Sequence, residues 1–345
     1  MAQINKPNTH FNPVLYTGNG ASNAITGVNF QPDFCWFKNR TGTNYHNLFD
    51  SVRGVTKSLA SNTYDLEETR TNGLTVFGTD GFTLGGNDGN VNTSGQSYAS
   101  WNWKAGGTAV SNTDGDITSS VSVNTDSGFS VVTWTGTASN ATVGHGLGVV
   151  PKITIVKNRN IIANWIVGGS LIEDVGGSTN NYILLNTTAG MDTSTALYAS
   201  YNTDTIGVKT DANINGSGQG MVMYCFAEKK GFSKFGSYVG NGSDDGTFVY
   251  TGFKPAFVII KSTAIKTWIM LDNKRGSYNV NQSKLFPNDS SAENNDASNG
   301  IDFLSNGLKL RRDNTEINAS GATYIYMAFA ENPLVGTNNI PATAR

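Results

Sequence analysis

Three short apolar stretches, each ending in a lysine, decide the fold of this 345-residue chain: Phe34-Cys35-Trp36-Phe37-Lys38, Ile153-Thr154-Ile155-Val156-Lys157 and Phe257-Val258-Ile259-Ile260-Lys261. Each stretch has the length and the β-branched or aromatic content of a buried β-strand. A proline precedes the lysine by six residues in all three places. This constant spacing indicates an internal repeat, because unrelated strands have no reason to share it.

Two further anchors recur in the same order around these stretches. Before each stretch, an aromatic residue leads into a glycine-containing turn, at Tyr16, Trp134 and Tyr238. After each stretch, an asparagine is followed eleven residues later by another aromatic, at Trp103, Phe226 and Phe329. The spacing between the strand lysine and this last aromatic is nearly the same in all three places. We therefore predict three tandem repeats in which the last aromatics are mostly buried.

Turn-forming residues separate short apolar alternations along the whole chain. The sequence contains 40 Gly, and Asn-Gly or Asp-Gly pairs, which favour hairpin turns, recur between Asn19 and Asn306. No stretch keeps apolar residues at helical spacing over three turns. The predicted fold class is all-β, with three tandem β-sandwich repeats of the jelly-roll or lectin-like kind.

The anchors divide the chain into repeats of about 100 residues, a normal size for one β-sandwich. The predicted units are an N-terminal arm at 1–10, repeat 1 at 11–106, a linker or edge hairpin at 107–127, repeat 2 at 128–230, repeat 3 at 233–335 and a C-terminal arm at 336–345. The join between repeats 2 and 3 is very short, so we expect these two to pack in a fixed relation.

Charge and composition exclude several classes of protein. The net charge is −2 and 14% of the residues are charged, so no basic surface for nucleic acid is expected. No apolar run is long enough to cross a bilayer and the chain lacks a basic-then-apolar start, so we expect neither membrane insertion nor a signal peptide. Cys35 and Cys225 lie far apart in the sequence and are interpreted as small core residues.

A search for catalytic chemistry gives negative results. The sequence has no phosphate loop, no nucleophile elbow and only three histidines. His145 lies in a glycine-rich stretch and is interpreted as a turn residue, and Asp114 and Asp116 lack the further ligands of a calcium loop. We predict no catalytic residues, no metal, no cofactor and no enzymatic activity.

One polar constellation occurs twice. His46, Asp50 and Arg53 in repeat 1 correspond to residues of repeat 3, namely Trp268, Asp272 and Arg275. Repeat 2 has Val167-Gly168-Gly169 at this place and lacks both charges. Two interpretations are open: the six residues form ligand-binding loops, or each Asp–Arg pair clamps its own turn, which is the commoner role of such a pair.

Several strings of this sequence resemble a domain repeated in virion structural proteins of marine bacteriophages, of the tail-fibre or surface-appendage type and similar to those of cyanophages and pelagiphages. The matching strings are residues 32–40, 48–54, 101–106, 141–148, 151–159 and 328–333. The resemblance covers almost the whole chain and implies a non-enzymatic structural protein located in the virion. It supplies no catalytic residues, and repeat 2 departs from the pattern at the Asp–Arg turn.

Three functions are compatible with these observations. An appendage protein that contributes to host-surface recognition would place an exposed aromatic beside Asn or Asp, to hold a glycan. A capsid decoration or fibre adaptor would bury its loops against other virion proteins. A depolymerase-type tailspike would need two carboxylates at glycosidase spacing. Because single sandwiches leave edge strands to cover, we also expect a homo-oligomer, best guessed as a trimer, held partly by the arms at 1–10 and 335–345.

Overall fold

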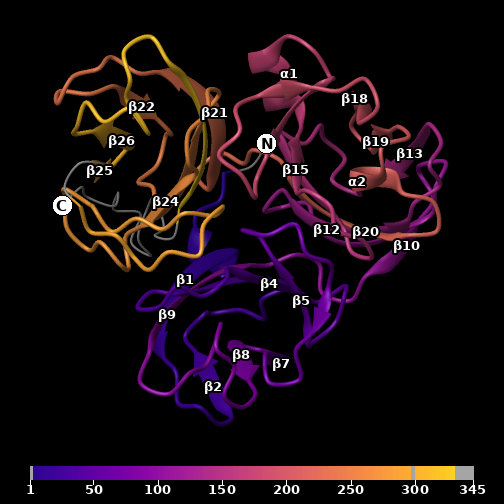
Figure 1. The fold of residues 1–345 in the computed structure, drawn as a ribbon, viewed down its shortest axis with the longest axis horizontal. Coiled ribbons are helices and arrows are strands. Elements are labelled where there is room, and N and C mark those ends of the chain that lie inside the picture. The colour runs from indigo at the N-terminus through magenta and orange to yellow at the C-terminus, as the bar shows by residue number, and fades with distance from the viewer. Residues whose placement is uncertain (1–2, 297–299, 331–345) are drawn as a thin grey trace.

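The computed structural model describes residues 3–296 and 300–330, and most elements in these ranges are β-strands. Three lobes surround a common centre (Figure 1). We call residues 11–103 lobe 1, residues 110–226 lobe 2 and residues 233–329 lobe 3. The short helix η1 (Pro7–Thr9) precedes lobe 1. The prediction of an all-β fold is confirmed.

Lobe 1 consists of two antiparallel sheets. The larger sheet has the strand order β1-β9-β3-β4-β5-β6 and the smaller has β2-β8-β7. The larger sheet contains β1 (Phe11–Thr17), β3 (Phe34–Asn39), β4 (Asn47–Asp50), β5 (Lys57–Ala60), β6 (Glu68–Thr69) and β9 (Ser97–Trp103). The smaller sheet contains β2 (Asn23–Thr26), β7 (Leu74–Gly78) and β8 (Gly81–Leu84).

Lobe 2 repeats this order with two strands added at one edge. Its larger sheet runs β10-β11-β12-β20-β14-β15-β16-β17 and its smaller sheet β13-β19-β18. The larger sheet contains β10 (Val110–Asn112), β11 (Ser119–Asn124), β12 (Phe129–Thr135), β14 (Ile153–Asn158), β15 (Ile166–Gly168), β16 (Asn181–Leu184), β17 (Asp192–Thr193) and β20 (Gly220–Phe226). The smaller sheet contains β13 (Ala141–Gly144), β18 (Tyr198–Tyr201) and β19 (Thr205–Val208). The added strands β10 and β11 form a hairpin in the region predicted as a linker or edge hairpin.

The larger sheet of lobe 3 has fewer strands in the described residues than those of lobes 1 and 2. It runs β21-β27-β23-β24, and the smaller sheet runs β22-β26-β25. The strands are β21 (Ser233–Val239), β22 (Phe248–Tyr250), β23 (Phe257–Ser262), β24 (Ile269–Asp272), β25 (Ile301–Leu304), β26 (Gly307–Leu310) and β27 (Thr323–Phe329). The same order thus recurs in the three lobes, and it places Lys38, Lys157 and Lys261 on the equivalent strands β3, β14 and β23. The predicted C-terminal arm at 336–345 lies outside the described residues.

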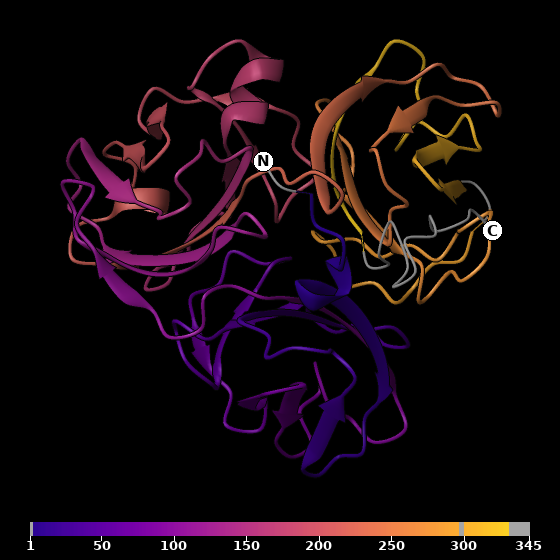
Figure 2. The same cartoon turned by 180° about the vertical axis from the view of Figure 1, so that it is seen from behind.

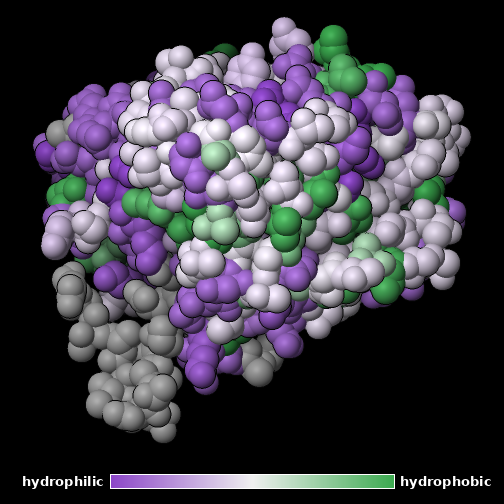
Figure 3. Space-filling model, turned by 90° about the horizontal axis from the view of Figure 1, so that it is seen from below, coloured by the Kyte–Doolittle hydropathy of each residue, from purple (hydrophilic) through white to green (hydrophobic). Residues whose placement is uncertain are grey.

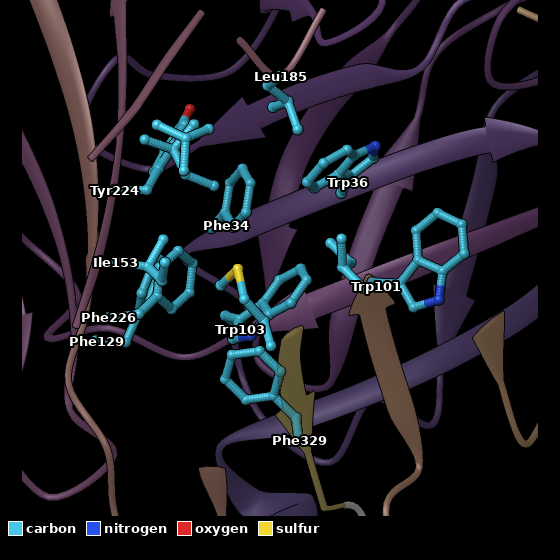
Figure 4. Packing of buried hydrophobic residues seen from close by; sticks show 14 of the residues in the cluster. Phe34, Trp36, Trp101, Trp103, Phe129, Ile153, Leu185, Tyr224, Phe226 and Phe329 are labelled. Atoms are coloured by element: carbon cyan, nitrogen blue, oxygen red, sulfur yellow. The ribbon is translucent and has the colours of Figure 1, made fainter. Parts of the chain in front are cut away.

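The strands β3, β14 and β23 are buried on both faces, so their apolar residues follow one another without alternation. On β3, Cys35 and Phe37 face the core between the two sheets of lobe 1, whereas Phe34 and Trp36 face the centre of the molecule. Cys225 is likewise buried in the core of lobe 2, which confirms the interpretation of both cysteines as core residues. The central core, shared by all three lobes, contains aromatic side chains from each of them, including five of the six tryptophans (Figure 4).

The three last aromatics of the sequence pattern meet in this shared core. The ring centroids lie 6.2 Å apart for Trp103 and Phe226, 5.6 Å for Trp103 and Phe329, and 5.8 Å for Phe226 and Phe329. Their exposed fractions are 2%, 3% and 2%, so their predicted burial is confirmed. These three side chains therefore belong to one core shared between the lobes, and not to three separate cores inside the individual lobes.

Lobe 2 also contains the two α-helices of the described residues, α1 (Ser170–Gly176) and α2 (Ala212–Asn215). Neither was expected, because both are shorter than the three turns over which an apolar helical pattern becomes visible. Helix α1 directly follows Gly169, where lobes 1 and 3 have their Asp–Arg turns. Its residues Leu171 and Ile172 are buried in the central core.

The aromatic-x-Gly motif at the end of the first strand of each lobe has a steric cause. A Cβ on Gly18, Gly136 or Gly240 would collide with a backbone carbonyl oxygen, that of Thr93, Gly216 and Ala319 respectively. The anchor asparagine next to that carbonyl holds the turn. Asn318, for example, accepts the N–H of Asn241 at 3.0 Å and donates to the carbonyls of Ser243 and Arg312.

Replacing Gly240 by alanine is therefore expected to destabilise the protein by about 1–3 kcal/mol, the usual effect of overpacking. The free energy of unfolding in urea measures this effect. Gly89→Ala is the matched control, because a Cβ there meets one side-chain nitrogen at ordinary contact distance. Equal stabilities of the two variants would contradict the steric explanation.

Candidate functional site

The first repeated Asp–Arg pair lies in an ionic link between lobes 1 and 2. Asp50 accepts the backbone N–H of Arg53 at 2.8 Å and contacts its guanidinium Nε. Arg53 also donates to Glu67 at 3.0 Å, and Glu67 accepts two hydrogen bonds from Arg159 of lobe 2, at 2.9 and 2.8 Å. Tyr224 of lobe 2 donates its hydroxyl to Asp50 at 2.8 Å. We call Asp50, Arg53, Glu67 and Arg159 the first ionic link.

The second pair repeats this geometry between lobes 3 and 1. Arg275 binds Asp272 at 2.6 Å and Glu293 at 3.2 Å. Arg40 of lobe 1 donates two hydrogen bonds to Glu293, both at 2.8 Å. Trp101 of lobe 1 donates its indole N–H to Asp272 at 2.9 Å, in the place that the hydroxyl of Tyr224 has in the first link. We call Asp272, Arg275, Glu293 and Arg40 the second ionic link.

In each link the glutamate stays ionised despite burial. Burial opposes ionisation of Glu67, but the hydrogen bond from Arg159 and the charge of Arg53 outweigh it, so the pKa lies below its usual value. In the same way, burial of Glu293 is outweighed by Arg40 and Arg275, and its pKa is also lowered. Each of these two glutamates is therefore a charged group paired with two arginines.

Between lobes 2 and 3 the equivalent link is apolar. In the two ionic links, the backbone N–H of Glu67 donates to the carbonyl of Arg159, and that of Glu293 donates to the carbonyl of Arg40. The backbone N–H of Met191 donates to the carbonyl of Thr263 in the same arrangement. Met191 and Thr263 thus stand where the other two interfaces have Glu and Arg. Ile172, buried in the central core, takes the place of the central arginine. One chain therefore contains ionic and apolar versions of the same interface.

An aromatic or imidazole side chain lies directly before the strand that follows the lysine strand in each lobe, namely before β4, β15 and β24. The backbone N–H groups of His46, Trp165 and Trp268 bond the side-chain oxygens of equivalent asparagines, Asn62, Asn186 and Asn288. The indole of Trp165 reaches the carbonyl of Ala60 in lobe 1, and that of Trp268 reaches Leu184 in lobe 2. His46 accepts the indole N–H of Trp36, and burial holds its pKa well below the usual value.

The three strand lysines also join neighbouring lobes, which the sequence analysis did not foresee. Lys38 donates to the carbonyl of Ser290 in lobe 3 at 2.9 Å, and Lys157 to Tyr64 in lobe 1 at 2.9 Å. Lys261 donates to Thr188 in lobe 2 at 3.5 Å. Burial lowers the pKa of each ammonium group to about 8. The repeated lysine at the end of an apolar strand was the one sequence signal for this role. The carbonyl groups that each lysine binds lie far away in sequence and could not be identified from it.

The lysine pKa values lead to a pH prediction. The folded pKa, about 8, is lower than the ordinary value of 10.5, so the unfolded chain binds more protons between these values. Wild-type stability therefore gains from Lys157 as the pH rises through this window. Relative to Lys157→Met, we expect wild type to gain about 2 kcal/mol of unfolding free energy between about pH 7.5 and 9.5.

Denaturant unfolding of both proteins at the two pH values measures this difference. Burial raises the pKa values of Cys35 and Cys225, which makes stability fall with pH, but both proteins share this contribution. A difference that stays constant or shrinks with pH would show that Lys157 stays charged in the fold.

All six candidate ligand-binding residues lie inside the protein. His46, Asp50, Arg53, Trp268, Asp272 and Arg275 are at most 8% exposed. They do not line loops that are open to a polysaccharide; the Asp–Arg pairs clamp their turns and, beyond that, connect lobes. The structure brings each set to its interface, and Glu67, Glu293, Arg40 and Arg159 complete the two links without having been singled out from the sequence.

The titratable groups outside the two links include no candidate metal site in the described ranges. No group of three His, Cys, Asp or Glu residues there is arranged to hold a metal ion. His145 is buried in its turn and accepts the N–H of Leu147 at 3.2 Å, as a turn residue should. The helices of the described residues are too short or too polar to span a membrane. On the face seen in Figure 3, hydrophobic side chains are scattered in small patches among hydrophilic ones.

Comparison with known proteins identifies a matching family. A model of a protein family described as a domain of unknown function (DUF7483) matches residues 6–333, which include all three lobes. A comparison with curated proteins found no match.

Proposed function

The chain belongs to the DUF7483 family, and we propose that it is a non-enzymatic structural protein of a bacteriophage virion, a component of a tail fibre or other surface appendage. The resemblance of its repeated strings to marine phage virion proteins supports the virion location. The observation that carries the structural role is the closure of three lobes around one aromatic core, tied by buried ionic links and lysines. Charged groups in these ties are used for cohesion, and both Asp–Arg pairs have no exposed side-chain surface.

Within this proposal, the burial of the six candidate residues favours a fibre adaptor or decoration protein over a host-glycan receptor that uses those loops. An arrangement of three similar lobes in one chain suits a place on a threefold axis, where each lobe meets an equivalent partner surface. The partners in this role are other virion proteins. Self-association as a homotrimer remains a prediction, which the mass of the purified protein in solution tests.

Antibody labelling of intact virions by electron microscopy tests the location. We expect label on a tail appendage or on the capsid surface, and no label on virions would refute the proposal. Incubation of the protein with host envelope polysaccharide tests the non-enzymatic role, because released oligosaccharide would contradict it. A strong adsorption defect on deletion of the protein, combined with polysaccharide binding, would instead assign it to host recognition.

A further inference from the structure

Strand β21 is the outermost strand of its sheet, and no described strand pairs with its outer edge. Its register with β27 shows which backbone groups face outward. Ala330 donates to the carbonyl of Phe232, and Gly240 donates to that of Ala322, so the even-numbered residues between them bond β27. The backbone N–H and C=O groups of Phe235 and Ser237 therefore point away from the sheet.

The equivalent edges of the other two lobes are protected. In lobe 2, β11 pairs antiparallel with β12 and covers Val131 and Thr133, the counterparts of Phe235 and Ser237. In lobe 1, the counterpart of Phe235 is Pro13, which has no N–H to offer. Proline and added strands are two ways in which proteins prevent unwanted pairing at a sheet edge. Among the three described edges, β21 has neither protection.

The open edge lies in a groove of about 1150 Å³ between lobes 2 and 3. Helix α1 forms the facing wall (Figures 1 and 2). Val150, Val239 and Tyr250, which are 37%, 55% and 63% exposed, line the groove with apolar surface. Of the charged groups in the groove, Lys152 is paired with Asp174 and Lys234 with Glu228. The groove thus offers outward-facing backbone groups of β21 and apolar side chains for contact. Most of its charged side chains are already paired with one another.

We propose that β21 is a docking edge for an extended segment of another protein, which pairs antiparallel with β21 as β11 pairs with β12. The pairing of β11 with β12 shows in this same chain which strand this position accepts. Strand β11, Ser119–Asn124, alternates small polar residues with valines and carries no charge. The partner segment has the same chemistry, with its aliphatic side chains against Val150, Val239 and Tyr250. This inference does not depend on the location of the protein in a virion.

A labelled peptide with the sequence of residues 117–125, which includes β11, is the probe, and fluorescence anisotropy with the full chain measures its binding. Ser237 is exposed, so Ser237→Pro removes an outward N–H with little disturbance of the core. Ser237→Thr keeps the N–H and copies Thr133 of lobe 2. We expect wild type and Ser237→Thr to bind, and Ser237→Pro to bind about tenfold more weakly.

Tyr250→Ala is a second variant, on a neighbouring strand, that weakens apolar contact without touching the β21 backbone. Circular dichroism establishes that each variant is folded. If Ser237→Pro fails to fold, the Tyr250→Ala result decides, and we again expect weaker binding. Equal binding by wild type and every folded variant, or no binding by wild type at millimolar peptide, would overturn the proposal.

Two further outcomes would assign the edge to a different occupant and thereby overturn the proposal of a separate partner. A chain ending at residue 330 that binds the peptide when the full chain does not would point to residues 331–345 as the occupant. A dimer of the full chain that Ser237→Pro dissociates would point to a second copy.

Discussion

Replacing Trp103 by alanine is expected to destabilise the protein by about 3–5 kcal/mol, the largest effect that we predict for a single core side chain. Trp103 is 2% exposed and contacts aromatic rings from all three lobes. Its ring centroid lies 4.8 Å from that of Phe11, 5.2 Å from Phe34 and 5.6 Å from Phe329. The cavity left by truncation would be surrounded by several sheets, which cannot all move inward to fill it.

Urea unfolding followed by fluorescence and circular dichroism measures the effect. Trp103→Phe is the matched control, because Phe226 and Phe329 occupy the equivalent positions and the indole N–H of Trp103 has no hydrogen-bond partner in the described structure. We expect this control to change stability by less than about 1.5 kcal/mol. Tyr278→Ala, at a side chain that is 82% exposed, should have almost no effect. A loss below about 1 kcal/mol for Trp103→Ala would show that the shared core does not hold the lobes together.

Replacing Arg275 by methionine is expected to cost about 3–5 kcal/mol, because it leaves Asp272 and Glu293 buried without their shared counter-ion. Arg275 has no exposed side-chain surface and donates to both carboxylates and to the carbonyl of Met270. Loss of Arg275 strands the carboxylate of Asp272 and leaves Glu293 with Arg40 as its only cationic partner among the described residues. This penalty exceeds the net value of the intact link.

Removing the three buried charges of the second ionic link together should cost much less, because the charge that remains, on Arg40, is 23% exposed to water. The triple variant Asp272→Asn, Arg275→Met and Glu293→Met eliminates the stranded carboxylates, and the new amide oxygen at position 272 can still accept the backbone N–H of residue 275. We expect it to lie within about 2 kcal/mol of wild type, since buried ion pairs are often replaced by apolar residues at little cost. The apolar link between lobes 2 and 3, with Ile172 and Met191, is a natural precedent.

Denaturant unfolding of the single and triple variants measures both effects, and the non-additivity of the changes reports their coupling. A triple variant less stable than Arg275→Met would contradict this account and would show that the link contributes net stability to the interface. Only the comparison of the two variants separates the penalty of a stranded charge from the value of the link.

The sequence alone allowed the all-β class, the recurring strand pattern and the core role of several residues to be predicted, because these depend on local spacing. Apolar stretches of strand length before Lys38, Lys157 and Lys261 indicate buried strands, and Asn-Gly turns separate them. The burial of the three last aromatics follows from their constant distance to the anchor asparagines. Helix α1 escaped prediction because two turns carry too little periodic signal.

Only the tertiary structure decided what these residues contact. An apolar strand looks the same in sequence whether its second face meets another sheet or another lobe, so the shared central core could not be read from the pattern. The Asp–Arg turns are visible as pairs, but their connection to Glu67 and Arg159 joins distant parts of the chain and depends on how the lobes pack. The outer edge of β12 is covered by β11 and that of β1 carries Pro13, whereas β21 has neither protection. This difference depends on strand register, which is set by long-range pairing and not by local sequence.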